Sequence, residues 1–291
     1  MKKGKLTIKQ TEKINHNISY PDRIKNIQTF GYGLEVHLTE HCNLNCKGCS
    51  HFSPLADEEF MKIEVFERDI ARMSQLFGRN EIMRITLLGG EPLLHPQVND
   101  FMKTVVKYFP NMPLQLVTNG LLLPKMSQSF WETCRTTGTH IRISRYPIKL
   151  DFPALEKKAQ EEGVGVIVHP RENFRIFRRD VYDLSGMQNE RFSHSACELF
   201  GYCCQLNNGR FYPCTISAYF HHLNRFFKLG ISISDNNFID IHKAKSKDEF
   251  YKLITAPVPC CKHCNLNARE FDVKWERSKQ NLDEWTHTIA S

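Results

Sequence analysis

The sequence predicts an α/β protein with a parallel sheet, because strand-like and helix-like segments alternate strictly between residues 34 and 168. The strand-like runs are residues 34–38, 82–88, 114–118, 141–144 and 164–168. Parallel strands are joined by right-handed crossovers, and functional groups gather at their C-terminal ends. We therefore expect the functional site at those ends.

Each element has its own signal. Apolar and polar residues alternate over 34–38, which predicts the first strand. From Phe66 to Phe77 the apolar residues recur every three or four positions, which predicts a helix that Gly78 can end. Further helices are expected at residues 98–109, near 129–136 and near 153–162. The second strand runs into Gly89-Gly90-Glu91-Pro92 and the third into Asn119-Gly120.

The remaining segments are less regular. Residues 1–30 are polar and lack clear periodicity, so we expect an extension that packs on the main domain or frays. Residues 170–196 show no convincing period and are expected to form a bridge that lines the site. Asn208-Gly209 between two strand-like runs predicts a hairpin. The charged segment from Asn267 to Trp285 is expected to be helical.

Composition excludes several classes of protein. The chain has 291 residues, of which 41% are hydrophobic and 24% charged, as is usual for a soluble globular protein. No apolar run approaches the roughly 20 residues of a membrane-spanning helix, and the N-terminus has no secretion signal, so a cytoplasmic location is expected. The net charge of +7 favours a phosphorylated or nucleotide-linked substrate or an acidic redox partner. Basic residues are not interleaved with aromatic ones, so no nucleic-acid partner is expected.

Eleven cysteines without a secretion signal favour thiolate ligands or catalysts over a disulfide framework. Cys42, Cys46 and Cys49 have the spacing C-x3-C-x2-C and directly follow the first strand. Three thiolates around one inorganic centre leave a coordination position open for a substrate or cofactor. A zinc site or a set of reactive thiols is the alternative.

This cysteine spacing resembles the cluster-binding motif of the radical S-adenosylmethionine (SAM) superfamily, in which three cysteines hold a 4Fe-4S cluster and the fourth iron chelates SAM. The resemblance implies a partial (β/α)6 TIM-like barrel at residues 31–195, after an N-terminal extension at 1–30. In that family the residue before the third cysteine is usually aromatic and packs near the adenine. Here it is Gly48, and Phe52 is the expected substitute.

Other strand-end residues resemble the SAM-binding segments of the same family. Gly89, Gly90 and Glu91 look like its GGE motif, whose backbone and glutamate meet the amino group of SAM. Asn119 is similar in position to the ribose-proximal segment. Ser144 and Arg145 end the fourth strand, where the family often places groups that face the SAM carboxylate or ribose. For Arg145 a solvated loop position is the alternative.

A second set of cysteines resembles the auxiliary-cluster region of SPASM and twitch enzymes. Its members are Cys197, Cys214, Cys261 and Cys264. No cysteine follows Cys264, so the resemblance implies one fully ligated 4Fe-4S cluster in a small twitch-like domain of hairpin and helix at residues 196–291. A four-cysteine zinc site is the alternative. The unassigned cysteines are Cys203, Cys204 and Cys260, of which Cys204 or Cys260 could replace a neighbour, and Cys134, which is expected in the core.

Candidate substrate groups lie just past the strand that ends at Val168. They are His169, Arg171 and Arg175, with Arg178 close by. One of them could bind a phosphate or accept a hydroxyl proton, although solvated charges on a connecting loop would look the same. His41 and His51, beside the first cysteines, are expected to be packing or outer-sphere residues.

The resemblance implies that a flavodoxin or ferredoxin supplies one electron, that SAM is cleaved to a 5'-deoxyadenosyl radical, and that this radical abstracts a substrate hydrogen. The layout is similar to that of the anaerobic aminocyclitol (2-deoxy-scyllo-inosamine) dehydrogenases. We therefore expect oxidation of a secondary alcohol in a sugar, cyclitol or nucleotide sugar. The alternatives are a peptide-modifying enzyme, a sugar epimerase, and a structural or regulatory iron-sulfur or zinc protein.

Overall fold

The computed structural model describes residues 19–77, 81–169, 176–232 and 235–287. Its helices are α2 (Tyr20–Phe30), α3 (Ile63–Leu76), α4 (Val98–Tyr108), α5 (Gln128–Thr137), α6 (Phe152–Glu161), α7 (Glu190–Ala196), α8 (Thr215–Phe226) and α9 (Lys247–Thr255). Its strands are β1 (Tyr32–Thr39), β2 (Ile82–Gly89), β3 (Leu114–Thr118), β4 (His140–Ser144), β5 (Val166–His169), β6 (Ile176–Arg179), β7 (Cys204–Asn207), β8 (Arg210–Tyr212), β9 (Ile239–Asp240) and β10 (Glu270–Lys274).

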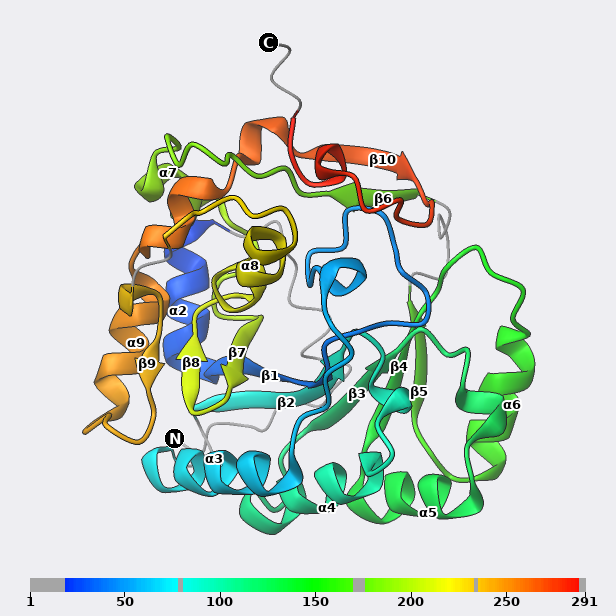
Figure 1. Ribbon diagram of the computed structural model, residues 1–291. Helices are drawn as coiled ribbons and strands as arrows, with labels where there is room; N and C mark the ends of the chain where they lie inside the picture. Colours follow the sequence, from blue (N-terminus) through cyan, green and yellow to red (C-terminus); the bar gives the residue numbers. More distant parts are fainter. Residues whose placement is uncertain (1–18, 78–80, 170–175, 233–234, 288–291) are drawn as a thin grey trace.

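The main sheet has the strand order β5-β4-β3-β2-β1-β7-β8-β9. Strands β1 to β5 pair in parallel, and β7 also runs parallel to β1, whereas β8 and β9 are antiparallel. Helices α3, α4 and α5 lie along one side of this sheet (Figure 1). The predicted α/β class with a partial parallel barrel is confirmed, as is the hairpin at Asn208-Gly209. Strand β6 pairs with β10 in a separate two-stranded sheet.

The main core lies between the sheet and its covering helices. Leu34, Val36 and Leu38 of β1 are buried in the same apolar cluster as Phe66 and Ile70 of α3. This is the result that alternation in the strand and helical spacing in α3 predict. A smaller second apolar cluster surrounds α8 and includes Phe52, Tyr182, Phe220 and Trp285, which come from four separate parts of the chain.

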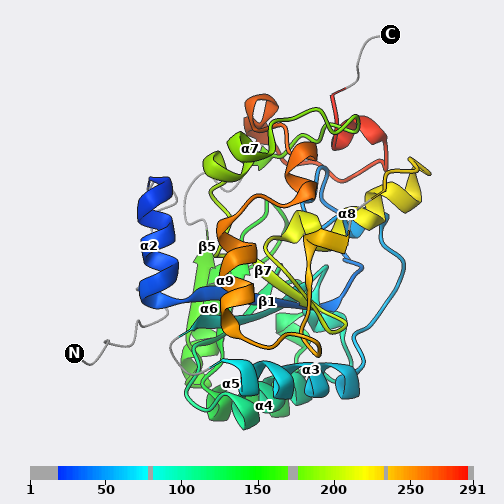
Figure 2. The same ribbon diagram turned by 90° about the vertical axis from the view of Figure 1, so that its left-hand side faces the viewer.

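The N-terminal segment contains a helix that periodicity did not indicate. Ser19 caps α2 by accepting a hydrogen bond from the Asp22 backbone amide at 3.4 Å, and Pro21 stands in its first turn. The Tyr20 hydroxyl donates to the Thr255 carbonyl at 3.2 Å, so α2 packs beside the end of α9 (Figures 1 and 2). Residues 19–30 therefore pack on the rest of the chain as a helix, with Ile27 buried in the main core.

The segment expected to form a bridge, residues 170–196, contains β6 and α7 in its described part, and Phe177 and Arg179 of β6 line the cavity beside the first cysteines. One expectation is corrected. The segment from Asn267 to Trp285, expected to be helical, contains β10 and a short 3-10 turn at Leu282–Glu284. Its backbone pairs with β6 and does not form a continuous helix. The expected end of α3 at Gly78 lies outside the described residues.

Candidate active site

The first three cysteines lie on a loop that follows the end of β1. Cys42, Cys46 and Cys49 line one cavity of about 120 Å³ together with residues from the ends of β2, β3 and β4. Those residues include Gly89, Gly90, Thr118, Asn119, Ser144 and Tyr146. A neighbouring cavity of about 350 Å³ shares Cys46, Cys49, His51 and Tyr146 with it. The structure thus brings the cysteine loop and the three strand ends to one place.

The glycines are required by close backbone contacts. A Cβ atom at Gly90 would lie 1.9 Å from the carbonyl oxygen of His41, and one at Gly89 would lie 2.2 Å from that of Thr39. Gly48 has φ +65°, and a Cβ there would meet the Arg179 side chain at 3.0 Å. An aromatic residue at position 48 would therefore require the cysteine loop to move.

Burial is the main cause that raises the pKa of Cys42 to about 11 and of Cys46 to about 12, and neighbouring thiols add to the rise. Without a metal, these thiols are protonated at neutral pH. A bound iron would replace the protons, because thiolates are its ligands. The donor set of three neighbouring thiols beside a polar cavity fits a cluster with one open iron.

Glu91 fixes the ends of β2 and β3 to each other. Its carboxylate accepts hydrogen bonds from the Thr118 hydroxyl at 2.6 Å, the Asn119 amide at 2.9 Å and the Leu93 amide at 3.1 Å. Burial raises the pKa of Glu91 to about 7, although these hydrogen bonds oppose the rise. The carboxylate is fully buried behind the cavity, so its present contacts are with the protein.

Asn119 and Ser144 reach the cavity, whereas Arg145 points elsewhere. Asn119 Nδ2 donates to Asn43 Oδ1 at 2.7 Å and lies 3.8 Å from Cys42 Sγ. The Arg145 guanidinium lies 5.1 Å from the centre of the Phe152 ring, on the first residue of α6. A contact between Arg145 and SAM stays a prediction that this orientation does not favour.

Phe52 is fully buried in the second apolar cluster and is not among the residues that line the cavity of the first cysteines. Its ring centre lies 5.4 Å from that of Tyr182 and 6.0 Å from that of Phe220. Its expected contact with adenine is therefore untested and unsupported by this packing. Tyr146, which the sequence reading did not select, is the aromatic residue in the cavity, and it stacks on Phe177 at 5.4 Å. Tyr146 could have been found from the sequence, because it directly follows Ser144 and Arg145 at the end of the fourth strand.

The histidines beside the loop make protein contacts. His51 Nδ1 lies 2.7 Å from His37 Nε2, and burial lowers the pKa of His51 to about 3. His37 in turn lies 3.1 Å from a Glu40 oxygen, and the same oxygen is 3.0 Å from His222 Nε2. His41 packs edge-on against Phe60 with ring centres 5.0 Å apart.

The C-terminal segment lies against the cysteine loop (Figure 1). The Trp275 indole donates to Cys46 Sγ at 3.2 Å. The Lys47 amide donates to the Glu276 carbonyl at 3.0 Å, and the Trp285 indole donates to the Cys49 carbonyl at 2.9 Å. Sequence reasoning missed Trp275 and Trp285, because no local pattern connects them with residues more than 200 positions earlier.

The second set of cysteines also gathers at one place. Cys197, Cys214, Cys261 and Cys264 line one cavity with apolar residues that include Val181, Tyr182, Leu199, Phe200, Ile216 and Val258. Burial raises the pKa of Cys261 to about 12. Cys203, Cys204 and Cys260 are not among the residues that line this cavity. Four thiols in an apolar cavity fit a fully ligated cluster.

Cys134 is buried in α5 with its Sγ 3.8 Å from Met102 Sδ, which confirms the expected core position. None of the eleven cysteines is in a disulfide. Within residues 19–77, 81–169, 176–232 and 235–287, no group of three or more His, Cys, Asp or Glu side chains is arranged around a single metal ion. In the same described ranges, no helix has the length and apolar character needed to cross a membrane.

Of the four expected substrate groups, Arg171 and Arg175 lie outside the described residues. His169 ends β5 with an exposed side chain, and its carbonyl accepts a hydrogen bond from the Arg145 amide at 2.8 Å. Arg178 forms ion pairs with Asp180 at 3.4 Å and Glu198 at 3.0 Å.

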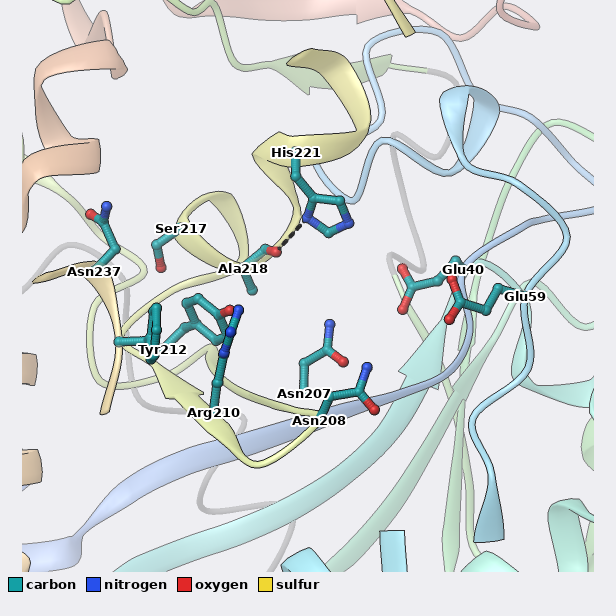
Figure 3. A pocket seen from close by; sticks show the side chains of 11 residues that line it. Glu40, Glu59, Asn207, Asn208, Arg210, Tyr212, Ser217, Ala218, His221 and Asn237 are labelled. Carbon is teal, nitrogen blue, oxygen red and sulfur yellow. Dashed lines mark hydrogen bonds between the residues drawn. The ribbon is translucent and has the colours of Figure 1, made fainter. Parts of the chain in front are cut away.

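A larger polar cavity of about 580 Å³ lies between the end of β1 and the β7–β8 hairpin (Figure 3). Glu40 and Glu59 line one side, and Asn207, Asn208 and Arg210 line the other, with His221 of α8 above them. Its volume is in the range of small-molecule sites. The sequence reading did not find it, because its walls come from three distant segments.

Comparisons with known proteins agree with this geometry. Residues 36–144 match the family model described as the radical SAM superfamily. The chain is similar to the GTP 3',8-cyclase of Sulfurovum sp. (strain NBC37-1), with 33% identity over 33% of this chain and 29% of the relative. The probable GTP 3',8-cyclase of Pyrococcus abyssi (strain GE5 / Orsay) is 33% identical over 46% of this chain and 39% of the relative. The chain therefore matches less than two fifths of the length of either relative.

The solved structure of BtrN in complex with AdoMet and 2-DOIA shares the fold. It is 17% identical, has a TM-score of 0.50, and the alignment covers 81% of this chain and 93% of BtrN. The cysteine loop and the strand-end glycines lie within residues 36–144, the part of this chain that matches the radical SAM superfamily model.

Proposed function

We propose that this protein is a radical SAM enzyme that oxidises a secondary alcohol of a sugar, cyclitol or nucleotide sugar. The observation that carries the proposal is the gathering of Cys197, Cys214, Cys261 and Cys264 in one apolar cavity. A closed cluster there has no free iron for substrate, so its role would be electron transfer. In this proposal, residues 1–30 form an extension, 31–195 the barrel, and 196–291 the auxiliary-cluster domain.

Cys42, Cys46 and Cys49 would hold a 4Fe-4S cluster and the second set of cysteines would hold another. When bound, the first cluster would supply the electron that cleaves SAM, and the second would accept the electron that the substrate radical loses, together with a proton, as the ketone forms. The net reaction converts one secondary alcohol and one SAM into a ketone, methionine, 5'-deoxyadenosine and a proton. A flavodoxin or ferredoxin would provide the first electron.

The residues of the cavity have roles consistent with SAM binding. The glycines let the backbone approach the ligand, and Asn119 and Ser144 offer polar side chains on the same cavity wall. Glu91 holds the β2 and β3 ends together from behind. The carboxylates, amides and arginine that line the cavity in Figure 3 support a polar substrate over an apolar one.

The proposal is tested by anaerobic reconstitution followed by a substrate screen. We expect about eight irons per chain, as two 4Fe-4S clusters require. The reduced protein is then incubated with SAM and with sugars, nucleotide sugars, GTP and peptides in turn. Formation of 5'-deoxyadenosine that depends on one alcohol, with loss of two hydrogens from the product, is the expected result. Finding zinc instead of iron at the four C-terminal cysteines would contradict the proposed oxidation of an alcohol.

The same screen separates the other candidates. A peptide-modifying enzyme would respond only to a peptide, and an epimerase would return a product of unchanged mass. The curated relatives are named GTP 3',8-cyclases, and a response to GTP would favour related chemistry. A structural or regulatory iron-sulfur or zinc protein would form no 5'-deoxyadenosine with any of them.

A further inference from the structure

Among the residues that the structure describes, none forms a hydrogen bond with the buried hydroxyl of Tyr182. The residue is 3% exposed. Buried hydroxyl groups in proteins nearly always have a hydrogen-bond partner, so an acceptor is expected for this one when the cysteine site is filled. Tyr182 lines the cavity of Cys197, Cys214, Cys261 and Cys264, and its backbone forms a β-bridge with Cys264.

Geometry places Tyr182 between the two sites. It lines the cavity of the C-terminal cysteines, and its ring packs against Phe52, which directly follows the first cysteine loop. A tyrosine hydroxyl is protonated at neutral pH and can donate a hydrogen bond to a sulfur atom.

The Tyr182 ring also touches the first cysteine loop. It packs against Phe52, whose backbone amide donates to the Cys49 carbonyl at 3.0 Å. The Tyr182 amide donates to the Trp285 carbonyl at 2.8 Å, and the Trp285 indole donates to the Cys49 carbonyl at 2.9 Å. Two sets of contacts therefore lead from Tyr182 to Cys49.

We infer that Tyr182 is a positioning residue shared by the two cysteine sites. Its hydroxyl donates a hydrogen bond to a sulfur atom of the iron-sulfur cluster held by Cys197, Cys214, Cys261 and Cys264. Its ring, packed on Phe52, fixes that site against the loop of Cys42, Cys46 and Cys49. This inference rests on the proposed function, since it assumes a cluster at the C-terminal cysteines.

The test uses full-length protein in which Cys42, Cys46 and Cys49 are changed to Ala, so that only the C-terminal cluster remains. Tyr182→Phe is added to this background, and the midpoint potential is measured by redox titration with electron paramagnetic resonance. A hydrogen bond to sulfur favours the reduced, more negative cluster. We expect its loss to lower the ratio of reduced to oxidised cluster about tenfold at a fixed potential, which is about 59 mV for one electron.

A second measurement detects the hydrogen bond itself. In protein exchanged into heavy water, electron–nuclear double resonance should detect an exchangeable deuteron coupled to the reduced C-terminal cluster, and this signal should be absent in Tyr182→Phe. If Tyr182→Phe fails to assemble a cluster, the parent protein with ring-deuterated tyrosine is measured in ordinary water. A coupled ring deuteron would place a tyrosine beside the cluster, and the absence of both couplings would overturn the inference.

Tyr219→Phe is the matched control. Tyr219 is fully buried in the same apolar cluster but does not line the cavity of the C-terminal cysteines, because its hydroxyl lies by the His37 backbone and its ring stacks on the His37 ring with centres 3.7 Å apart. We expect no change in potential. An unchanged potential in Tyr182→Phe, or an equal shift in Tyr219→Phe, would overturn the inference. Zinc in place of iron, found by metal analysis beforehand, would instead overturn the proposed function on which it rests.

Discussion

The two cysteine sites differ in the number of thiols and in their surroundings. Three thiols of the first line a cavity with the polar side chains of Asn119 and Ser144 and with glycine backbone. Four thiols of the second line a cavity whose wall includes Val181 and Ile216 but also Arg269. Under the proposed function, the first site would meet SAM and the second would be closed by its own four ligands.

The largest effect is expected from Cys46→Ala. Removing one of three ligands from the open site should reduce 5'-deoxyadenosine to the level found without protein, because the open iron can no longer be held. Chromatography after anaerobic incubation with SAM and a reductant measures this. Cys134→Ala, in the α5 core, should keep cleavage. If Cys46→Ala still cleaved SAM, the assignment of the open site to this loop would be wrong.

A smaller effect is expected at the closed site. The double variant Cys261→Ala, Cys264→Ala should keep part of the SAM cleavage but form no ketone, and its iron should fall from about eight to about four per chain. Iron analysis and product mass measure the two effects. Cys203→Ala should retain both, because Cys203 is not among the residues that line the cavity. Loss of iron in Cys203→Ala would show that the ligand set differs.

The stability of the protein is expected to depend on pH because of Glu91, which is buried behind the cavity of the first three cysteines. Burial raises the pKa of Glu91 to about 7, so the folded protein holds its proton more tightly than the unfolded chain does. The stability from this group is complete below the unfolded pKa and is lost as the pH rises through 7. In metal-free protein the free energy of unfolding should fall by on the order of 3 kcal/mol across this range.

Urea unfolding between pH 4.5 and 8 measures this dependence on pH. The glutamine in Glu91→Gln cannot ionise, so the fall in the free energy of unfolding that is due to Glu91 should disappear in this variant. An identical slope in the variant would mean that another group is responsible.

The smallest effect is expected from Trp275→Phe. It removes the indole donor from Cys46 Sγ while keeping an aromatic ring, so the first cluster should become harder to reduce and SAM cleavage should persist. A redox titration measures the shift. Trp285→Phe is the control, because its indole donates to the backbone carbonyl of Cys49 and not to a sulfur. Equal shifts in both variants would contradict a specific role for Trp275.

The comparison also explains what the sequence could predict. The first three cysteines lie within eight positions on one loop, so their spacing alone indicated a shared centre. The parallel strands were found because their apolar runs are local patterns. The segment that contains β10 was predicted to be helical because it is rich in charged residues. Its pairing with β6, about 90 positions earlier, cannot be read from the local sequence. Tyr182 and Trp275 acquire their positions only through such distant contacts.

Strand β7 pairs directly with β1, so neighbouring strands of one sheet lead toward both sets of cysteines. Strand β1 runs into the first loop, and β7 begins seven residues after Cys197. Neighbouring strands are held about 4.8 Å apart by backbone hydrogen bonds. The two sets of cysteines are therefore attached to one backbone framework, and an insertion in the chain between β1 and β7 would leave the pairing of these two strands unchanged.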